Sequence, residues 1–266
     1  MATTTTTTAT HLYREVRGSG PAVLLVAGAT GDAGHFTRTA ERLADEFTVI
    51  AYDRRGNSRS RNGADASAAA TIAAQADDAA ALIRECGFAE AVVFGTSGGA
   101  EIALELLARQ PGVVRGAILH EPPILAVLPA PEGPSPMEPI LARAATDPRA
   151  ALEDFVKLNS SETAWAALDP ATRERMLGNA TTLFGREIDQ FVSYRPDEDV
   201  LRALETPVVL LRSRDGLPFA EPVQSWLESN TRAKSCTISG HHAPYFDTPE
   251  VFAEELRPIL RDLWRG

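Results

Sequence analysis

Short apolar runs alternate with amphipathic stretches along most of the chain. The runs at 22–27, 47–52 and 91–94 are short and mostly apolar, which is typical of buried strands in a parallel sheet. Stretches with apolar residues at helical spacing follow several of these runs and predict helices. The pattern therefore predicts an α/β protein whose mostly parallel sheet is covered by helices on both faces.

The same pattern gives approximate bounds for the individual elements. The expected strands are 12–17 (an edge strand), 22–27, 47–52, 91–94, 116–119, 207–211 and 236–239, and the expected helices are 36–46, 68–86, 100–110 and 249–264. Because functional sites on parallel sheets lie at the carboxyl ends of the strands, the loops that follow these strands are the places to search.

One long segment breaks this alternation. From Glu121 to about Asp199, proline recurs early and several helical stretches follow with no clear strand, which indicates an insertion into the sheet-forming chain. We expect three parts: a disordered threonine-rich tail at 1–11, a core formed by 12–121 and 200–266, and a helical cap at 122–199.

Charge and cysteine content exclude several classes of partner and site. The net charge of −10 argues against nucleic acid or an anionic membrane surface as the partner. The chain has no apolar run of membrane-spanning length, and its N-terminus lacks the features of a secretory signal, so we expect a cytoplasmic protein. Cys86 and Cys236 lie far apart in the sequence, which favours free thiols over a disulfide framework or a Cys-based metal site. The oligomeric state is left open.

A glycine-rich pentapeptide, Gly95-Thr96-Ser97-Gly98-Gly99, lies between an expected strand and an expected helix. A serine at such a junction is typical of a nucleophile elbow, whose strained turn exposes the hydroxyl. The turn also places Ser97 at a helix N-terminus, where free N–H groups and the helix dipole favour developing negative charge. The alternative is an ordinary glycine-rich turn in which Ser97 only caps the helix.

A serine nucleophile needs a neighbouring base, normally a histidine that a carboxylate orients. The chain has five histidines, which are His11, His35, His120, His241 and His242. His11 lies beside the tail and is a poor candidate. The pair His241–His242 follows the last expected strand, from where a loop can reach the elbow, so the base is expected there.

At this point the sequence resembles the α/β-hydrolase family. In that family a Gly-His pair follows the last strand and a Pro-Glu pair opens the final helix, as do residues 240–242 and 249–250 here. The offset between them places His242 on the family's catalytic position and leaves His241 as its neighbour. The segment 53–60 resembles the family's Asp-x-Arg-Gly-x-Gly-x-Ser motif, whose role is structural.

The resemblance also implies an oxyanion hole and an orienting acid. The N–H groups of Gly98 and of Ala29, in the loop after the first buried strand, hold the family's donor positions. Asp215 follows the strand at 207–211, as the family's acid does, and we favour it because serine members of the fold usually use that strand. Glu121, directly after the strand at 116–119, is the alternative acid, since some members place theirs at that location.

The resemblance implies an α/β-hydrolase fold with an inserted helical cap and a serine hydrolase that needs no cofactor and no metal. We expect a carboxylesterase or lactonase that cleaves a small apolar ester or lactone through an acyl-enzyme intermediate. The expected pocket residues are Phe36, Met137, Trp165, Leu217 and Phe219.

Other activities share the same three side chains and stay open. They are cofactor-free haloperoxidase or perhydrolase action, acyl transfer or thioester cleavage, and carbon–carbon bond hydrolysis. From a different class, the chain is alternatively a small-ligand receptor built on a hydrolase scaffold, which would not react through Ser97.

Overall fold

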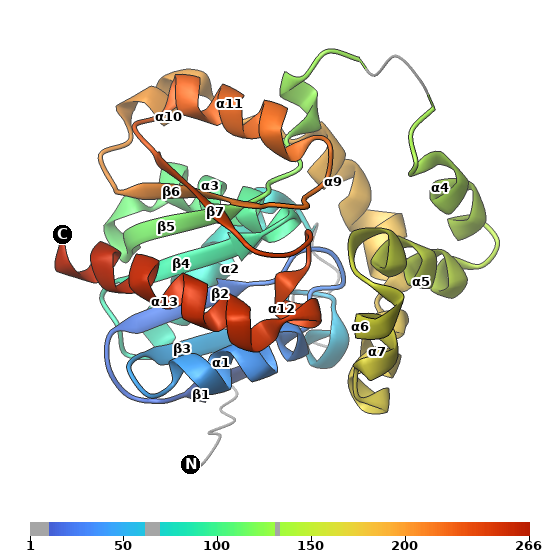
Figure 1. Cartoon of the computed structure of the whole chain (residues 1–266), viewed down its shortest axis with the longest axis horizontal. Helices are drawn as coiled ribbons and strands as arrows, with labels where there is room; N and C mark the ends of the chain where they lie inside the picture. The colour runs from blue at the N-terminus through green and yellow to red at the C-terminus, as the bar shows by residue number, and fades with distance from the viewer. Residues whose placement is uncertain (1–10, 62–69, 131–133) are drawn as a thin grey trace.

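The structure is a computed structural model that describes residues 11–61, 70–130 and 134–266. Its seven strands form one sheet in the order β1-β3-β2-β4-β5-β6-β7 (Figure 1). Strand β1 pairs antiparallel with β3, and every other neighbouring pair is parallel. The strands are β1 (Arg14–Arg17), β2 (Ala22–Val26), β3 (Thr48–Tyr52), β4 (Ala91–Thr96), β5 (Val114–His120), β6 (Val208–Ser213) and β7 (Lys234–Ile238). The mostly parallel sheet expected from the apolar runs is confirmed.

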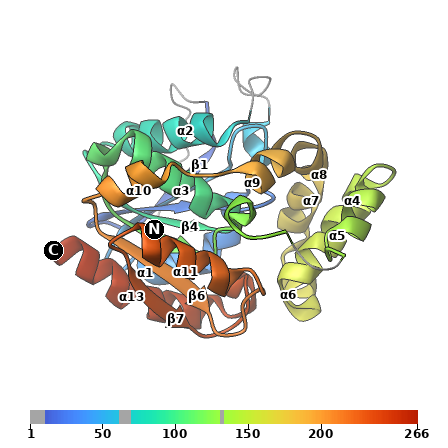
Figure 2. The same cartoon turned by 90° about the horizontal axis from the view of Figure 1, so that it is seen from above.

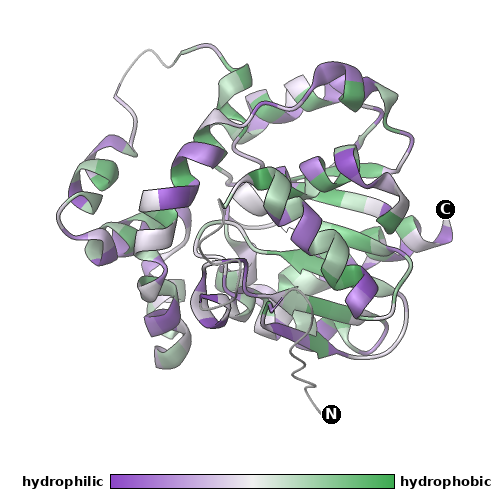
Figure 3. Cartoon of the chain, turned by 180° about the vertical axis from the view of Figure 1, so that it is seen from behind, coloured by the Kyte–Doolittle hydropathy of each residue, from purple (hydrophilic) through white to green (hydrophobic). Residues whose placement is uncertain are grey.

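Helices cover both faces of this sheet, as Figure 2 shows from above. One face packs against α1 (Thr37–Leu43) and α13 (Pro249–Arg265). The other face packs against α2 (Ile72–Glu85), α3 (Gly98–Arg109) and α11 (Ala220–Asn230). Strand β2 is buried along its whole length, because both of its faces lie under helices. Figure 3 shows these hydrophobic strands in green between helices with purple, hydrophilic turns.

Some element bounds differ from the expected ones by a few residues. The first expected helix begins as a 3₁₀ turn, η1 (Ala33–Phe36), before α1 continues. Helix α2 begins after Thr71, whose side chain accepts a hydrogen bond from the N–H of Ala74. Positions 68–69 of that expected helix and positions 1–10 of the expected tail lie outside the described residues.

Between β5 and β6, the described residues contain helices and no strand. Two short turns belong to this segment, the 3₁₀ turn η4 (Leu125–Val127) and the π-helical turn η5 (Leu183–Glu187). The α-helices are α4 (Glu138–Ala144), α5 (Pro148–Asn159), α6 (Glu162–Ala167), α7 (Pro170–Gly178), α8 (Ala180–Thr182), α9 (Ile188–Ser193) and α10 (Glu198–Ala203). Helix α10 already packs beside α11, where Arg202 donates to Asn230 at 2.7 Å. The division of the chain at 122 and 199 stays a prediction.

The helices of this insertion start where capping residues specify them. Asp147, Ser161 and Asp169 each precede a helix, and their side chains accept hydrogen bonds from N–H groups of its first turn. Pro148 and Pro170 occupy first-turn positions, where a missing N–H costs nothing. Helices α4 to α7 lie together as a separate group beside the sheet, on the right in Figure 1. In the described part of the chain, no helix has both the length and the apolar character needed to cross a membrane.

Candidate active site

Ser97 lies at the sharp junction between β4 and α3. Its backbone has φ 53° and ψ −131°, a conformation that costs a non-glycine residue energy and persists only where the surroundings enforce it. Two glycines make the turn possible. A Cβ atom at Gly95 would lie 2.3 Å from the carbonyl oxygen of Gly99, and one at Gly99 would lie 2.3 Å from that of Val26. The local geometry is therefore that of a nucleophile elbow.

The loop after β2 approaches the elbow closely. A Cβ atom at Gly28 would lie 2.8 Å from the Cβ atom of Ser97 and 3.5 Å from the backbone nitrogen of Gly98. Gly98 is the first residue of α3, so its N–H has no acceptor within the helix. Ala29, the next residue of the loop, lines the same cavity as Ser97. The two expected oxyanion donors thus belong to segments that meet beside the hydroxyl.

His242 pairs with a buried carboxylate. It lies between β7 and α12 (Pro244–Asp247) and is 4% exposed, and its Nδ1 is 2.6 Å from Oε2 of Glu121. The N–H of Ser213 donates to the other carboxylate oxygen at 2.8 Å. Burial disfavours the charge on Glu121, but the hydrogen bonds from His242 and Ser213 outweigh it, so the pKa of Glu121 lies below its ordinary value. An ionised carboxylate therefore holds one side of the imidazole, and Nε2 is left for other partners.

Asp215, the favoured acid in the sequence analysis, forms no hydrogen bond with His242 in the described structure. Its side chain is exposed, and its backbone carbonyl oxygen lies 3.2 Å from Nδ1 of His241. Glu121 occupies the expected place of Asp215, with its backbone at φ 45°. Gly216 makes room for this, since a Cβ atom there would lie 2.1 Å from Oε1 of Glu121. The geometry therefore pairs His242 with the alternative acid.

Ser97 and His242 line the same cavity. Within the described residues they form no hydrogen bond with each other, a contact that often tightens only when substrate is bound. The lining residues come from the core loops and from α5 and α7 of the insertion, and they are Ala29, Thr30, His35, Ser97, Phe155, Val156, Asn159, Ser160, Met176, His242, Ala243, Tyr245 and Phe246. The cavity encloses about 370 Å³ of empty space, its solvent-open part included.

The five pocket residues expected from the sequence do not line this cavity. Phe36 is 0% exposed and Trp165 is 5% exposed, because both are packed into the apolar core instead. Phe219 lies edge-on to the imidazole of His242, with ring centroids 5.9 Å apart, but outside the lining. Leu217 and Met137 are half-buried and also lie outside it. Hydrophobic character alone did not distinguish pocket walls from packing residues.

His120 is a buried neighbour of the site, and no sequence pattern indicates a role for it. Its Nδ1 lies 2.9 Å from the hydroxyl of Thr96, and its Nε2 lies 3.0 Å from that of Ser213. Its ring stacks on His242, with centroids 6.0 Å apart and planes 24° apart. Burial lowers the pKa of His120 to about 4, so the ring is neutral at pH 7. The His120 ring therefore packs against His242 and adds no positive charge beside it.

His35 is a second residue of the site that the sequence did not reveal. Its Nε2 lies 2.6 Å from the hydroxyl of Thr30, and its ring stacks on Tyr245 at 5.9 Å. Burial lowers the pKa of His35 to about 4, so this ring is also neutral at pH 7. In the sequence, only its position in the small-residue loop after β2 indicates that His35 lies near the site.

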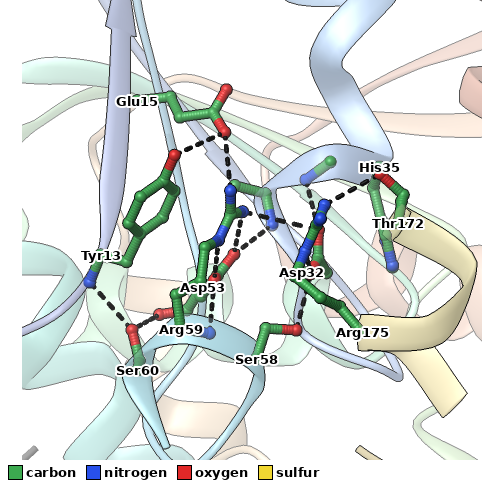
Figure 4. A network of polar contacts seen from close by, with 12 residues as sticks. Tyr13, Glu15, Asp32, His35, Asp53, Ser58, Arg59, Ser60, Thr172 and Arg175 are labelled. Atoms are coloured by element: carbon green, nitrogen blue, oxygen red, sulfur yellow. Dashed lines mark hydrogen bonds and ion pairs between the residues drawn. The ribbon is translucent and has the colours of Figure 1, made fainter. Parts of the chain in front are cut away.

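The segment 53–60 holds the loops beneath the site. Asp53 accepts hydrogen bonds from the N–H of Ala33 at 2.7 Å and from Nε of Arg59 at 2.6 Å (Figure 4). Asp32, in the loop after β2, accepts a bond from Nε of Arg175 in α7 at 3.0 Å (Figure 4). This network links the two core loops with the insertion and fits the structural role expected for the motif.

Glu101, one turn into α3, gives the folding stability a specific pH dependence. Its side chain is 0% exposed, and neither carboxylate oxygen has a hydrogen-bond partner among the described residues. Burial therefore raises its pKa well above the usual 4.5. Above pH 4.5 the unfolded chain releases this proton while the folded protein retains it, so this residue makes the folded state less stable as the pH rises, until the raised pKa is reached.

We expect Glu101→Gln to remove this dependence. Relative to wild type, the variant should gain about 1 kcal/mol of unfolding free energy for each pH unit above 5, until the raised pKa is passed. Urea denaturation of both proteins at pH 5, 6.5 and 8 measures the difference. A difference that does not change with pH would show that Glu101 ionises alike in the folded and unfolded states.

The comparisons with known proteins agree with this architecture. Residues 23–255 match the family model described as "Alpha/beta hydrolase family". "Uncharacterized hydrolase YraK" from Bacillus subtilis is 33% identical over 267 residues, covering 94% of this chain and 92% of that protein. A thermophilic esterase from Thermogutta terrifontis superposes with a TM-score of 0.72 at 24% identity, over 98% of this chain and 97% of that one. The N-acyl homoserine lactonase AidH superposes with a TM-score of 0.75 at 19% identity, over 99% and 98%.

A parallel sheet with a serine elbow after its fourth strand, and a histidine after its last, defines the class of α/β hydrolases. The chain belongs to the alpha/beta hydrolase family. The two superposed structures are less than 25% identical in sequence to this chain, so they show the shared fold alone.

Proposed function

We propose that this protein is a serine hydrolase that cleaves a small apolar ester or lactone through an acyl-enzyme intermediate. One observation carries the proposal: the buried hydrogen bond between His242 and Glu121, 2.6 Å long, beside a cavity that also contains Ser97. An imidazole held by a carboxylate on Nδ1 is arranged to accept a proton on Nε2.

In the first half of the reaction, Oγ of Ser97 attacks the carbonyl carbon and its proton passes to Nε2 of His242. The oxyanion that forms accepts hydrogen bonds from the N–H groups of Ala29 and Gly98, and each such donor is worth about 3 kcal/mol of activation energy. The intermediate then collapses, the carbon–oxygen bond to the alcohol breaks, and His242 returns the proton to the leaving alkoxide.

In the second half, water replaces the alcohol. His242 accepts a proton from the water as its oxygen attacks the acyl carbon, and the acid leaves as Oγ of Ser97 recovers the proton. We assign to Glu121 the role of holding the imidazole in its working tautomer and of stabilising the imidazolium. In this proposal Glu121, rather than Asp215, completes the triad.

The cavity supports a small substrate. Its empty space of about 370 Å³ includes a part that is open to solvent, so the space available to a bound group is smaller than that. The walls from the insertion include Phe155 and Val156 of α5 and Met176 of α7, which are apolar. Asn159 and Ser160 each donate a hydrogen bond to their own helix, at 2.7 and 2.9 Å, so their oxygens are left as acceptors.

A panel of p-nitrophenyl esters of increasing acyl length tests this proposal, alongside small lactones. We expect the acetate or butyrate to have the highest kcat/KM and longer chains to lose activity. Phe155→Ala should enlarge the cavity and raise the ratio of hexanoate to acetate kcat/KM about tenfold, a shift of about 1–2 kcal/mol that is typical of pocket methylenes.

Val192→Ala, at a residue 50% exposed on α9, serves as the control and should leave the ratio unchanged. Absence of ester and lactone cleavage across the whole panel would contradict the proposal and favour the ligand receptor. An unchanged ratio in Phe155→Ala would mean that α5 does not bound the acyl site.

A further inference from the structure

Arg54 holds the peptide unit that contains one of the proposed oxyanion donors. Its side chain is 0% exposed, and its Nη2 donates to the carbonyl oxygen of Gly28 at 2.8 Å. That carbonyl and the N–H of Ala29 belong to the same planar peptide unit. A hydrogen bond that fixes the direction of the carbonyl therefore also fixes the direction of the N–H.

The guanidinium is itself held by a residue of the insertion. Glu187, in η5, accepts hydrogen bonds from Nη1 and Nη2 of Arg54 at 2.5 and 3.0 Å, and both side chains are 0% exposed. Asn57 donates to the same carboxylate at 3.1 Å, and Arg54 also donates to the side chain of Gln75. A planar guanidinium bonded on several sides has little freedom to turn away from Gly28.

The same part of the insertion contacts the other proposed donor. Phe191 follows Glu187 by one helical turn, and a Cβ atom at Gly98 would lie 2.7 Å from Cε1 of the Phe191 ring. The guanidinium of Arg54 also lies 5.5 Å from the centroid of that ring. Phe191 thus packs against the segment of Gly98, while Glu187, four positions earlier, reaches the segment of Ala29 through Arg54.

From this arrangement we infer that Glu187 is a positioning residue for catalysis. It acts through Arg54 to orient the Gly28–Ala29 peptide unit, and hence the N–H of Ala29, toward the oxyanion. The inference rests on the proposed function. It gives the helical insertion a part in stabilising the oxyanion as well as in covering the substrate. A cationic donor on the Gly28 carbonyl also polarises the peptide unit, which strengthens the bond that its N–H donates.

Glu187→Gln tests this inference, because it keeps the shape of the side chain and removes its charge. With p-nitrophenyl acetate, we expect kcat to fall about 10–100-fold, somewhat less than the loss of a whole oxyanion donor. KM should change by less than about threefold, since a ground-state carbonyl gains little from the donor. The inactivation rate by diethyl p-nitrophenyl phosphate, which also builds negative charge on an oxygen, should fall in parallel with kcat.

Thr182→Val is the matched control. Thr182 belongs to the same insertion and donates to the carbonyl oxygen of Gly56 at 2.9 Å, and within the described residues it makes no hydrogen bond to the loop after β2. Its loss should leave kcat within about twofold of wild type. If Glu187→Gln fails to fold, the double variant Arg54→Met with Glu187→Leu replaces it, because removing both charges avoids a buried unpaired ion. The double variant should lose kcat to the same extent.

The outcomes separate this inference from the proposed function when Ser97→Ala is assayed in parallel. An inactive Ser97→Ala together with a wild-type kcat in Glu187→Gln, or in the double variant, overturns the inference and leaves the proposed function standing. Substantial turnover by Ser97→Ala overturns both. A kcat loss in Thr182→Val equal to that in Glu187→Gln also overturns it, because any disturbance of the insertion would then suffice.

Discussion

Ser97→Ala is expected to abolish ester cleavage and to leave the protein folded. In a serine hydrolase the loss of the nucleophile lowers kcat by about 10⁶-fold, because the histidine and acid act only through the hydroxyl. The Ser97 hydroxyl has no hydrogen bond to another described residue, and alanine keeps the Cβ atom that packs against Gly28. Turnover of p-nitrophenyl acetate and the thermal unfolding midpoint measure the two parts of this expectation.

One outcome of the Ser97→Ala assay would contradict this expectation. Turnover above about 1% of wild type in a folded Ser97→Ala protein would rule out the covalent route, since removal of a nucleophile costs far more than that. Contaminating esterase activity is controlled by purifying His242→Ala in the same way. Both variants should then show the same residual rate.

Glu121→Gln is expected to lower kcat by about 10³–10⁴-fold, whereas Asp215→Asn should stay within about threefold of wild type. The carboxylate of Glu121 accepts a hydrogen bond from Nδ1–H of His242, and an amide at that place can donate there instead and select the wrong tautomer. Asp215 is exposed, and among the described residues its hydrogen bonds run through its backbone, from its N–H to the carbonyl oxygen of Gly240 and between its own carbonyl oxygen and Nδ1 of His241. Comparing the two isosteric variants at saturating substrate isolates the charge from the shape.

The reverse order would contradict the pairing seen in the structure. If Asp215→Asn lost several orders of magnitude and Glu121→Gln stayed active, the acid would have to be the residue favoured from sequence. A folding control is needed, because Glu121 also accepts the buried N–H of Ser213 at 2.8 Å. The Glu121→Gln protein should therefore be compared with wild type by thermal unfolding before its kinetics are interpreted.

The sequence predicted the sheet and the elbow well, since both depend on local pattern. The seven expected strands correspond to the seven strands of the sheet, and the central ones were recognisable because buried parallel strands need continuous apolar residues. At the elbow, Cβ atoms added at Gly95 and Gly99 would clash with backbone atoms, so the glycines of the pentapeptide carry the turn. The insertion between β5 and β6 was also recognisable, because its prolines and helical stretches interrupt the alternation of strands and helices.

What the sequence could not resolve depends on contacts between distant segments. Asp215 and Glu121 both follow core strands, and only the three-dimensional path of the chain shows which carboxylate reaches His242. Gly216 belongs to this arrangement, because a Cβ atom there would lie 2.1 Å from Oε1 of Glu121. Likewise, Glu187 meets Arg54 across 133 positions of the chain, and no motif relates the two.

The expected pocket residues lie outside the cavity that contains Ser97 for a related reason. Apolar residues such as Phe36 and Trp165 were expected to face the substrate, but a hydrophobic side chain serves a core and a pocket equally well. The actual lining combines apolar residues of α5 with polar ones, including His35 and Asn159. Which face of a helix of the insertion is turned toward the site follows from its packing on the core loops, which composition does not specify.

The most direct test of the central claim is to trap Ser97 covalently. Diethyl p-nitrophenyl phosphate should transfer its phosphoryl group to Oγ of Ser97 and release p-nitrophenol, and mass spectrometry of the digested protein should locate the adduct on Ser97. In His242→Ala we predict labelling at least about 100-fold slower, because the hydroxyl then lacks its base. Labelling at another residue, or at the same rate without His242, would contradict a serine activated by this histidine.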